Sequence, residues 1–351
     1  MPELPEVETV ARDLRPLITG ATIVDATTSW ARTLRDISPE AFADGVAGRR
    51  IEHVGRRAKQ IVVDLSGHAF LTIHLKMTGQ LFVVPQGGPQ DPYVRLVLAL
   101  EDGREIRFRD IRKFGKVGLY VADDADPFAA IGPEPLADAF TVAAFRRRIR
   151  ARKGRLKPLL LDQGFVAGVG NIYADEALWA ARCHPLRTAG TLRPADERRL
   201  WLEIRRILTE AVVRRGSSID DYTAPDGDGE MQDHLAVYQR TGQPCLRCGH
   251  PIRRIVVGAR ATHFCSWCQR LPAADRAGAR AILRTLTGGA PERTGRRWTE
   301  LPGGEGSVGP DRDRRKPVKR DDGTSSEIAR AERTRRAAAT RRTAARASVG
   351  G

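Results

Sequence analysis

The feature that most restricts the possible fold is a change in hydrophobic periodicity along the chain. Between about residues 20 and 122, short runs such as QIVVDL, AFLTIHL and VRLVLAL alternate apolar and polar residues, and turn signals such as Gly87-Gly88-Pro89 separate them. A period of two residues with frequent turns predicts an antiparallel β-sandwich or barrel. From residue 141 to about 216 the apolar residues recur at helical spacing, so a helical domain is expected to follow.

Two further segments complete the expected α+β, multidomain organisation. Residues 3–17 place apolar residues at helical spacing directly after a proline, which predicts an N-terminal helix. Residues 123–140 are rich in Asp, Pro and Ala, which is typical of a linker. The predicted boundaries are 1–122 for the N-terminal helix and sandwich, 123–140 for the linker, 141–242 for the helical domain, 243–270 for a zinc finger and 271–351 for a basic tail. Within the tail, a transient helix is expected over residues 274–288, and disorder in the remainder.

Four of the five cysteines form a metal-binding pattern. Cys245 and Cys248 make one CxxC knuckle, Cys265 and Cys268 make another, and 16 residues separate them. Each knuckle can donate two thiolates to a tetrahedral zinc ion, and this spacing is typical of zinc rather than of disulfides in a cytosolic protein. Such a short module buries too little apolar area to fold alone. We therefore predict one structural Zn²⁺.

The charge of the chain indicates a polyanionic partner. The net charge is +16 and the pI is about 10.4, which is typical of proteins that bind nucleic acid. Between the knuckles, Arg253, Arg254 and Arg260 would lie on a hairpin and either contact phosphates or form only a solvated basic surface. No stretch resembles a membrane span or a signal peptide, so we expect a cytoplasmic, nucleoid-associated protein without membrane contact.

The N-terminus offers a chemical function of its own. Proline follows the initiator Met, a context in which Met is normally removed, so the mature chain would begin with the secondary amine of Pro2. The dipole of the following helix disfavours a protonated amine there, and Glu3 lies beside it to move protons. A neutral secondary amine is a good nucleophile toward a sugar C1′ atom. Without further context, an ordinary helix-opening proline would be the better interpretation.

Several motifs supply that context because they occur together in one order. MPELPEVETV, HLKMTGQL, DIRKFG, LKPLLLDQ, GVGNIYADEALW and the four-cysteine finger follow one another over about residues 1–270. Together they closely resemble the formamidopyrimidine-DNA glycosylase (Fpg, MutM) family, and the Leu4-Pro5 pair resembles the Fpg branch rather than the endonuclease VIII (Nei) branch. The resemblance implies a helix–two-turn–helix domain over 141–242 and double-stranded DNA bound between the lobes.

The resemblance also implies a reaction on oxidised bases or abasic sites. Pro2 would attack C1′ of the damaged nucleotide, expel the base and form a Schiff base, after which β- and δ-elimination would cut the strand. Glu3 would be the proton donor, Lys59 the proton donor for elimination, and Arg260 the donor for δ-elimination and a phosphate contact. Glu6 would support the site by hydrogen bonds. This chemistry needs no catalytic metal or redox cofactor.

Three side chains are expected to fill the space that the extruded nucleotide leaves. The resemblance maps them to Met77, Arg112 and Phe114. Apolar wedges replace stacking contacts, and Arg can bond the orphaned partner base. The alternative is that Met77 and Phe114 belong to the core, but the neighbouring Gly79 and Gly115 favour turns at a surface.

The remaining DNA-binding assignments are individually weaker. Lys113 stands where many relatives carry a second Arg. His74 would contact phosphate or be a strand-end histidine, and Lys157 would lie near the mouth of the site or be a solvated helix charge. Asn171 would cap the helix that begins in GVGNIYADE, and the exposed amides there would bind phosphate. Cys183 is expected in the core of the helical domain.

The match is weakest in the loop over residues 217–232 and in the tail. Ser217 and Ser218 replace a more frequent Thr pair, and the segment 226–231 is compact and acidic. This loop bears on base recognition, so a Nei-like specificity for oxidised pyrimidines or hydantoins stays open beside the preferred oxidised purines. A non-catalytic damage-binding protein is the third alternative. The tail would tether DNA weakly, and we expect a monomer.

Overall fold

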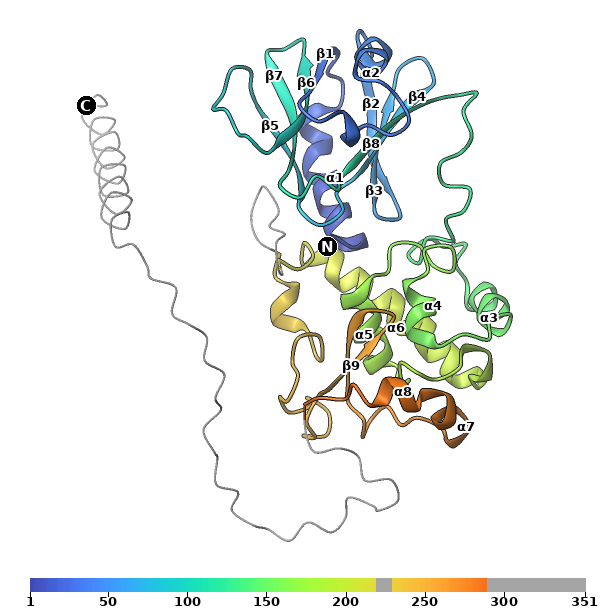
Figure 1. Cartoon of the computed structure of the whole chain (residues 1–351). Helices are drawn as coiled ribbons and strands as arrows, with labels where there is room; N and C mark the ends of the chain where they lie inside the picture. Colours follow the sequence, from blue (N-terminus) through green and yellow to red (C-terminus); the bar gives the residue numbers. More distant parts are fainter. Residues whose placement is uncertain (219–228, 289–351) are drawn as a thin grey trace, which may run out of the picture. The chain divides into compact units, whose positions relative to one another are not determined.

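The computed structural model describes residues 1–218 and 229–288, and Figure 1 shows the chain. After α1 (Leu4–Ile18), eight strands form two four-stranded antiparallel sheets with the orders β1-β6-β7-β5 and β2-β3-β4-β8. The strands are β1 (Ile23–Thr28), β2 (Ile51–Arg57), β3 (Gln60–Leu65), β4 (Ala69–His74), β5 (Gly79–Pro85), β6 (Val94–Leu100), β7 (Arg104–Asp110) and β8 (Lys116–Val121). The predicted α+β sandwich is confirmed, with the addition of the short helix α2 (Pro39–Val46).

Helix α1 belongs to the core of the sandwich. It contacts β2 and β3 of one sheet and β5 of the other, and Figure 1 shows it lying between the two sheets. Its buried face includes Val7, Val10, Leu14 and Ile18. This packing gives the N-terminus of α1 a defined position, although an isolated helix of this length would be marginal in water.

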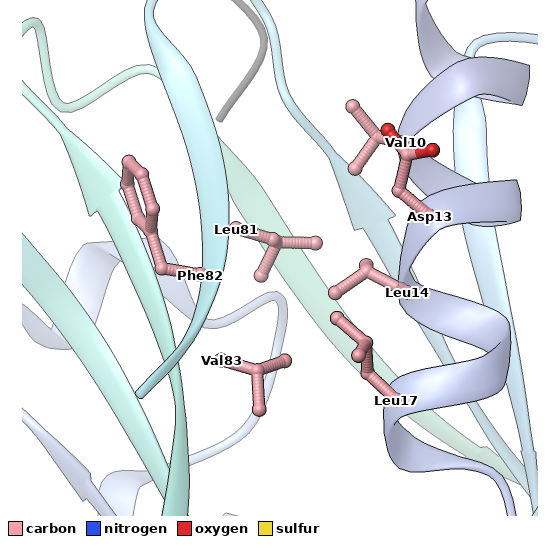
Figure 2. Close-up of a pocket in the computed structure, with 7 residues that line it drawn as sticks. All are labelled: Val10, Asp13, Leu14, Leu17, Leu81, Phe82 and Val83. Atoms are coloured by element: carbon pink, nitrogen blue, oxygen red, sulfur yellow. The ribbon is translucent and has the colours of Figure 1, made fainter. Parts of the chain in front are cut away.

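A small pocket of about 70 Å³ lies between α1 and β5. Figure 2 shows Leu81 and Val83 facing Leu14 and Leu17 of α1, while Phe82 points away from the helix, as strand alternation requires. All the α1 residues that line the pocket lie in the C-terminal two thirds of the helix. At a rise of about 1.5 Å per residue, Val10 is already about 10 Å along the axis from Glu3, so the pocket is separate from the N-terminal site.

The second half of the described chain is mainly helical and also carries a β-hairpin. It contains α3 (Val142–Arg150), α4 (Leu156–Leu161), α5 (Asn171–Ala180) and α6 (Pro194–Val213), followed by β9 (Arg253–Val257) and β10 (Arg260–Phe264). Cys183 is fully buried in the helical core, as predicted. Within the parts of the chain that the structure describes, no helix is both long and apolar enough to cross a membrane.

The first 18 residues of the predicted tail are folded, so the helix expected there is part of a packed segment and not a transient one. Residues 271–288 contain α7 (Ala273–Arg276) and α8 (Arg280–Leu283), and they pack on the hairpin through Ala279, Ile282 and Leu286. Aliphatic residues spaced within an Arg- and Ala-rich stretch supply an apolar face that overall composition conceals. The rest of the predicted tail, 289–351, lies outside the described residues.

Candidate active site

The site is built around the first turn of α1. Glu3 and Glu6 form a capping box in which the backbone N–H of Glu3 donates to Oε2 of Glu6 at 2.8 Å. The N–H of Leu4 donates to the carbonyl of Gly168 at 3.0 Å, which joins α1 to the helical domain. Pro2 is buried directly before this turn. Pro2 is therefore held at a junction between two domains.

The carboxylate of Glu3 occupies the N-terminus of α5. It accepts hydrogen bonds from the N–H groups of Gly170 (2.8 Å), Ile172 (2.8 Å) and Tyr173 (3.3 Å). A Cβ atom on Gly170 would lie 2.3 Å from Cδ of Glu3, so only glycine fits there. The expectation that these amides bind phosphate is wrong in this structure, because Glu3 already uses them. A helix N-terminus attracts the carboxylate as it would attract a phosphate.

Asn171 has a different position from the predicted cap. Gly170 is the N-cap residue of α5 and Asn171 is its first helical residue. The side-chain amide of Asn171 donates to the carbonyl of Ala261 in the zinc-finger hairpin at 3.1 Å. Asn171 therefore connects the helical domain to the finger, and its phosphate contact stays a prediction.

Glu6 joins three segments at the same place. Its Oε1 atom accepts hydrogen bonds from the Tyr173 hydroxyl at 2.5 Å and from the backbone N–H of Ser217 at 2.8 Å, while Oε2 accepts from Glu3. Tyr173 belongs to α5, and Ser217 begins the loop whose residues 219–228 lie outside the described chain. Glu6 thus joins α1, α5 and this loop by hydrogen bonds, and its supporting role in the reaction stays a prediction.

Lys59 lies in the hairpin turn between β2 and β3, and its charge interacts with those of Glu3 and Glu6. It is 7% exposed, and burial lowers the pKa of its ammonium group, while the charges of Glu3 and Glu6 oppose that shift. Arg260 and Lys76 lower the Lys59 pKa further. Burial raises the pKa of Glu3, the Lys59 charge opposes this, and Glu6 adds to it. Glu3, Glu6, Lys59 and Arg260 therefore lie within one electrostatic environment, although Arg260 itself is exposed on the hairpin.

Glu134 fixes the Lys59 turn and was missed from the sequence. Its Oε1 accepts from the backbone N–H of Ala58 at 2.6 Å and from Arg57 at 2.8 Å, and its Oε2 accepts from Arg56 at 2.8 Å. Ala58 has a φ of 54°, which a two-residue hairpin turn requires. The predicted linker therefore anchors a site residue as well as joining two domains. An acidic residue between prolines in GPEPL is the only local signal.

Arg112, Lys113 and Phe114 form an exposed turn between β7 and β8, so the core alternative is wrong for Phe114, which is 51% exposed. Met77 is half-buried in the turn before β5. Lys113 has a φ of 60°, and its ammonium group lies 4.3 Å from the centre of the Trp30 ring. The three predicted void-filling side chains thus come from two neighbouring turns.

One buried carboxylate, also missed from the sequence, connects these two turns. Oδ1 of Asp110 accepts from the Thr78 hydroxyl at 2.5 Å and from the backbone N–H of Arg112 at 3.2 Å. Oδ2 accepts from the N–H of Gly115 at 2.7 Å. Thr78 follows Met77 directly, so Asp110 sets the spacing between the Met77 turn and the Arg112–Phe114 turn. An Asp that ends a strand before a glycine-containing turn is a signal that could have identified it.

The structure contradicts the predicted DNA contact of Lys157. Its side chain is fully buried, and the ammonium group donates to Oδ1 of Asp175 at 2.5 Å and to the carbonyl of Asn171 at 2.9 Å. Oδ2 of Asp175 accepts from the backbone N–H of His263 at 2.9 Å. A lysine inside a helical apolar face is stable there because a buried carboxylate pairs with it. This pair joins α4, α5 and the finger.

His74 lies at the end of β4, and its Nδ1 atom accepts a hydrogen bond from the backbone N–H of Lys76 at 3.1 Å. Burial, followed by the charges of Lys76, Lys59 and Arg35, lowers its pKa to about 3. The imidazole is therefore neutral at physiological pH and carries its proton on Nε2. Its predicted phosphate contact would be a neutral hydrogen bond.

The four predicted zinc ligands converge. The sulfur atoms of Cys245, Cys248, Cys265 and Cys268 all lie within 4.8 Å of one another. A tetrahedron with Zn–S bonds of about 2.3 Å has S–S edges of about 3.8 Å, so the cluster fits one zinc ion. The Nε1–H group of Trp179 donates to Sγ of Cys245 at 3.4 Å. The ion would complete a structural site that packs against α5.

Fold and site together define a class of protein, a zinc-finger DNA glycosylase of the helix–two-turn–helix type. The family description "Formamidopyrimidine-DNA glycosylase N-terminal domain" matches residues 1–117, and "Formamidopyrimidine-DNA glycosylase H2TH domain" matches residues 131–223. "Zinc finger found in FPG and IleRS" matches residues 242–271. The chain belongs to the formamidopyrimidine-DNA glycosylase family.

Individual relatives agree with this membership. The formamidopyrimidine-DNA glycosylase of Herpetosiphon aurantiacus is 46% identical over 275 residues, which cover 77% of this chain and 100% of that protein. Lactococcus lactis Fpg in complex with abasic-site DNA superimposes with a TM-score of 0.72 at 36% identity, covering 76% of this chain and 99% of that one. Thermus thermophilus MutM superimposes with a TM-score of 0.69 at 42% identity, covering 77% of this chain and 100% of that one. The predicted family, fold class and enzyme class, a DNA-repair glycosylase and AP lyase, are confirmed.

Proposed function

We propose that this enzyme excises oxidised purines from double-stranded DNA through a Schiff base on Pro2 and then cleaves the strand by β- and δ-elimination. It acts as a monomer on nucleoid DNA in the cytoplasm. The observation that carries the proposal is the junction at Pro2, where Glu3 is buried against α5 and shares its electrostatic environment with Lys59. Relatives in complex with DNA containing Fapy-dG or carbocyclic 8-oxo-G support the substrate class.

In the first step, the amine of Pro2 forms a bond to C1′ after Met1 has been removed, and the glycosidic bond to the base breaks. The base leaves with the bonding electrons and takes up a proton. Glu3 is suited to move protons here, because burial raises its pKa above that of an ordinary glutamate. Opening of the sugar ring at O4′ then leaves an iminium ion between the Pro2 nitrogen and C1′.

In the second stage, the iminium ion makes the C2′ proton acidic. Loss of that proton breaks the C3′–O3′ bond, and a further elimination breaks the C5′–O5′ bond. Lys59 exchanges protons readily because burial lowers the pKa of its ammonium group. Arg260 on the finger hairpin binds the phosphate that departs and donates to it.

Borohydride trapping tests the proposal on two duplexes, one with 8-oxoguanine opposite cytosine and one with an abasic site. We expect a covalent adduct on both, and a loss or strong weakening in Pro2→Gly. Pro5→Ala, which changes a second proline of the same turn, should keep the adduct. Mass spectrometry verifies that Met1 is absent.

Each other outcome has a definite meaning. An adduct on the abasic duplex alone would retain the lyase and contradict the oxidised-purine substrate. No adduct on either duplex, with DNA still bound, would contradict the enzyme mechanism.

A further inference from the structure

Residues 271–288, here called the C-terminal clasp, extend the finger beyond the family match, which ends at residue 271. Relatives such as the Herpetosiphon aurantiacus protein are covered over their whole length by 77% of this chain. The clasp is nevertheless folded, with α7, α8 and a bridge between Thr287 and Arg254. It is therefore a folded addition to the part of the chain that the family match covers.

The clasp begins with a buried ionic anchor in the helical domain. Oδ1 of Asp275, which is 6% exposed, accepts from Nη1 of Arg155 at 3.1 Å and from the N–H and hydroxyl of Thr188 at 3.2 and 2.5 Å. Arg155 is the N-cap of α4, and Thr188 precedes a 3-10 turn. Three hydrogen bonds to one buried carboxylate oxygen give the start of the clasp a defined position.

The clasp ends on the free edge of the finger hairpin. The N–H of Thr287 donates to the carbonyl of Arg254 at 2.8 Å, and the N–H of Arg254 donates to the carbonyl of Thr287 at 2.9 Å. The hydroxyl of Thr285 accepts from the N–H of Val256 at 2.9 Å. These bonds use backbone groups of β9 that do not face β10, so the clasp covers an edge that would otherwise be open.

An apolar layer connects the two anchors. Ala279, Ile282, Leu283 and Leu286 pack with a finger and helical-domain cluster made of Leu186, Ile255, Val257 and Phe264. On the opposite strand, β10 is held by α5 through the Asn171–Ala261 and Asp175–His263 hydrogen bonds. The hairpin is thus fixed on both strands, by α5 on one and by the clasp on the other. A two-stranded hairpin is marginally stable alone, so the second support has a clear physical effect.

We propose that the clasp is a positioning element that holds the β9–β10 hairpin and, through it, Arg260 at the start of β10 and Cys265 just after its end. Its effect on the metal site and on the hairpin follows from the contacts above. Its effect on δ-elimination rests on the proposed function, because that function assigns the departing phosphate to Arg260.

The test uses the full-length, zinc-loaded protein with Asp275→Ala and Thr285→Val combined. We expect the amides of Arg254 and Val256 to exchange hydrogen about tenfold faster, and zinc to pass to a chelator about tenfold faster, because both anchors lose hydrogen bonds. δ-Elimination should fall relative to β-elimination. Asp233→Ala, at an exposed carboxylate away from the clasp, is the matched control. A chain that ends after Gly288 keeps the clasp and should behave as wild type.

Unchanged hydrogen exchange and unchanged zinc release in the double variant would overturn the proposed role of the clasp. Faster exchange and faster zinc release in the chain that ends after Gly288 would also overturn the proposal, because they would assign the effect to residues 289–351. Faster exchange and zinc release with unchanged δ-elimination would uphold the clasp and contradict the role of Arg260 in the proposed function.

Discussion

Replacing Asp110 by Asn tests whether one buried carboxylate orders the two turns that carry Met77, Arg112 and Phe114. The carboxylate accepts three hydrogen bonds, from Thr78, Arg112 and Gly115. In either orientation of the Asn amide, its NH₂ group faces a backbone N–H, that of Gly115 or that of Arg112. At least one hydrogen bond to a charged acceptor is lost, which is worth about 1.5–3 kcal/mol. Since about 1.4 kcal/mol is a factor of ten, we expect excision of 8-oxoguanine to slow about 10- to 100-fold.

The assay compares single-turnover excision of 8-oxoguanine with cleavage of a duplex that already contains an abasic site. Void-filling side chains matter most where a paired base must leave the stack. The rate of cleavage at the abasic site should therefore fall much less than the rate of 8-oxoguanine excision. Asp64→Asn, at a half-exposed carboxylate of β3, is the matched control and should change neither rate. Equal losses on both substrates, or no loss on either, with the fold intact, would refute the reasoning.

Three further predictions concern buried titratable groups. Burial raises the pKa of Glu3, so its contribution to stability is present below pH 4.5 and lost as the pH rises through the raised pKa. Urea titrations give the free energy of unfolding of Glu3→Gln and of wild type. The value for the variant minus that for wild type should therefore increase with pH, and a difference that does not change with pH would contradict the raised pKa of Glu3. His74, with a pKa of about 3, should show no NMR titration near pH 6.5, where an ordinary histidine titrates. Lys157→Met should lower the free energy of unfolding by about 3–5 kcal/mol, because Asp175 loses its buried partner. The salt dependence of DNA binding should not change, whereas a shallower slope would restore Lys157 as a phosphate contact.

Local sequence patterns determined much of this protein. The period-two runs predicted the antiparallel strands, and the helical spacing of residues 3–17 predicted α1, because both patterns reflect which face of one element is buried. The CxxC knuckles predicted the zinc site, since the two ligands of each pair come from a single tight turn. Motif order identified the family and, with it, Pro2 and Glu3 as candidates.

Only the tertiary structure decided what those residues contact. Glu3 binds the N-cap residue of a helix, Gly170, which lies 167 residues later in the chain, and Asp275 pairs with Arg155 across 120 residues. Lys157 forms a buried ion pair instead of the predicted DNA contact, because Asp175 lies opposite it in the folded domain. A local pattern records the burial of a residue's own element, whereas a hydrogen-bond partner depends on which distant segments packing brings together. The sequence therefore supplied the candidate reactive groups, and the fold determined how each one is held.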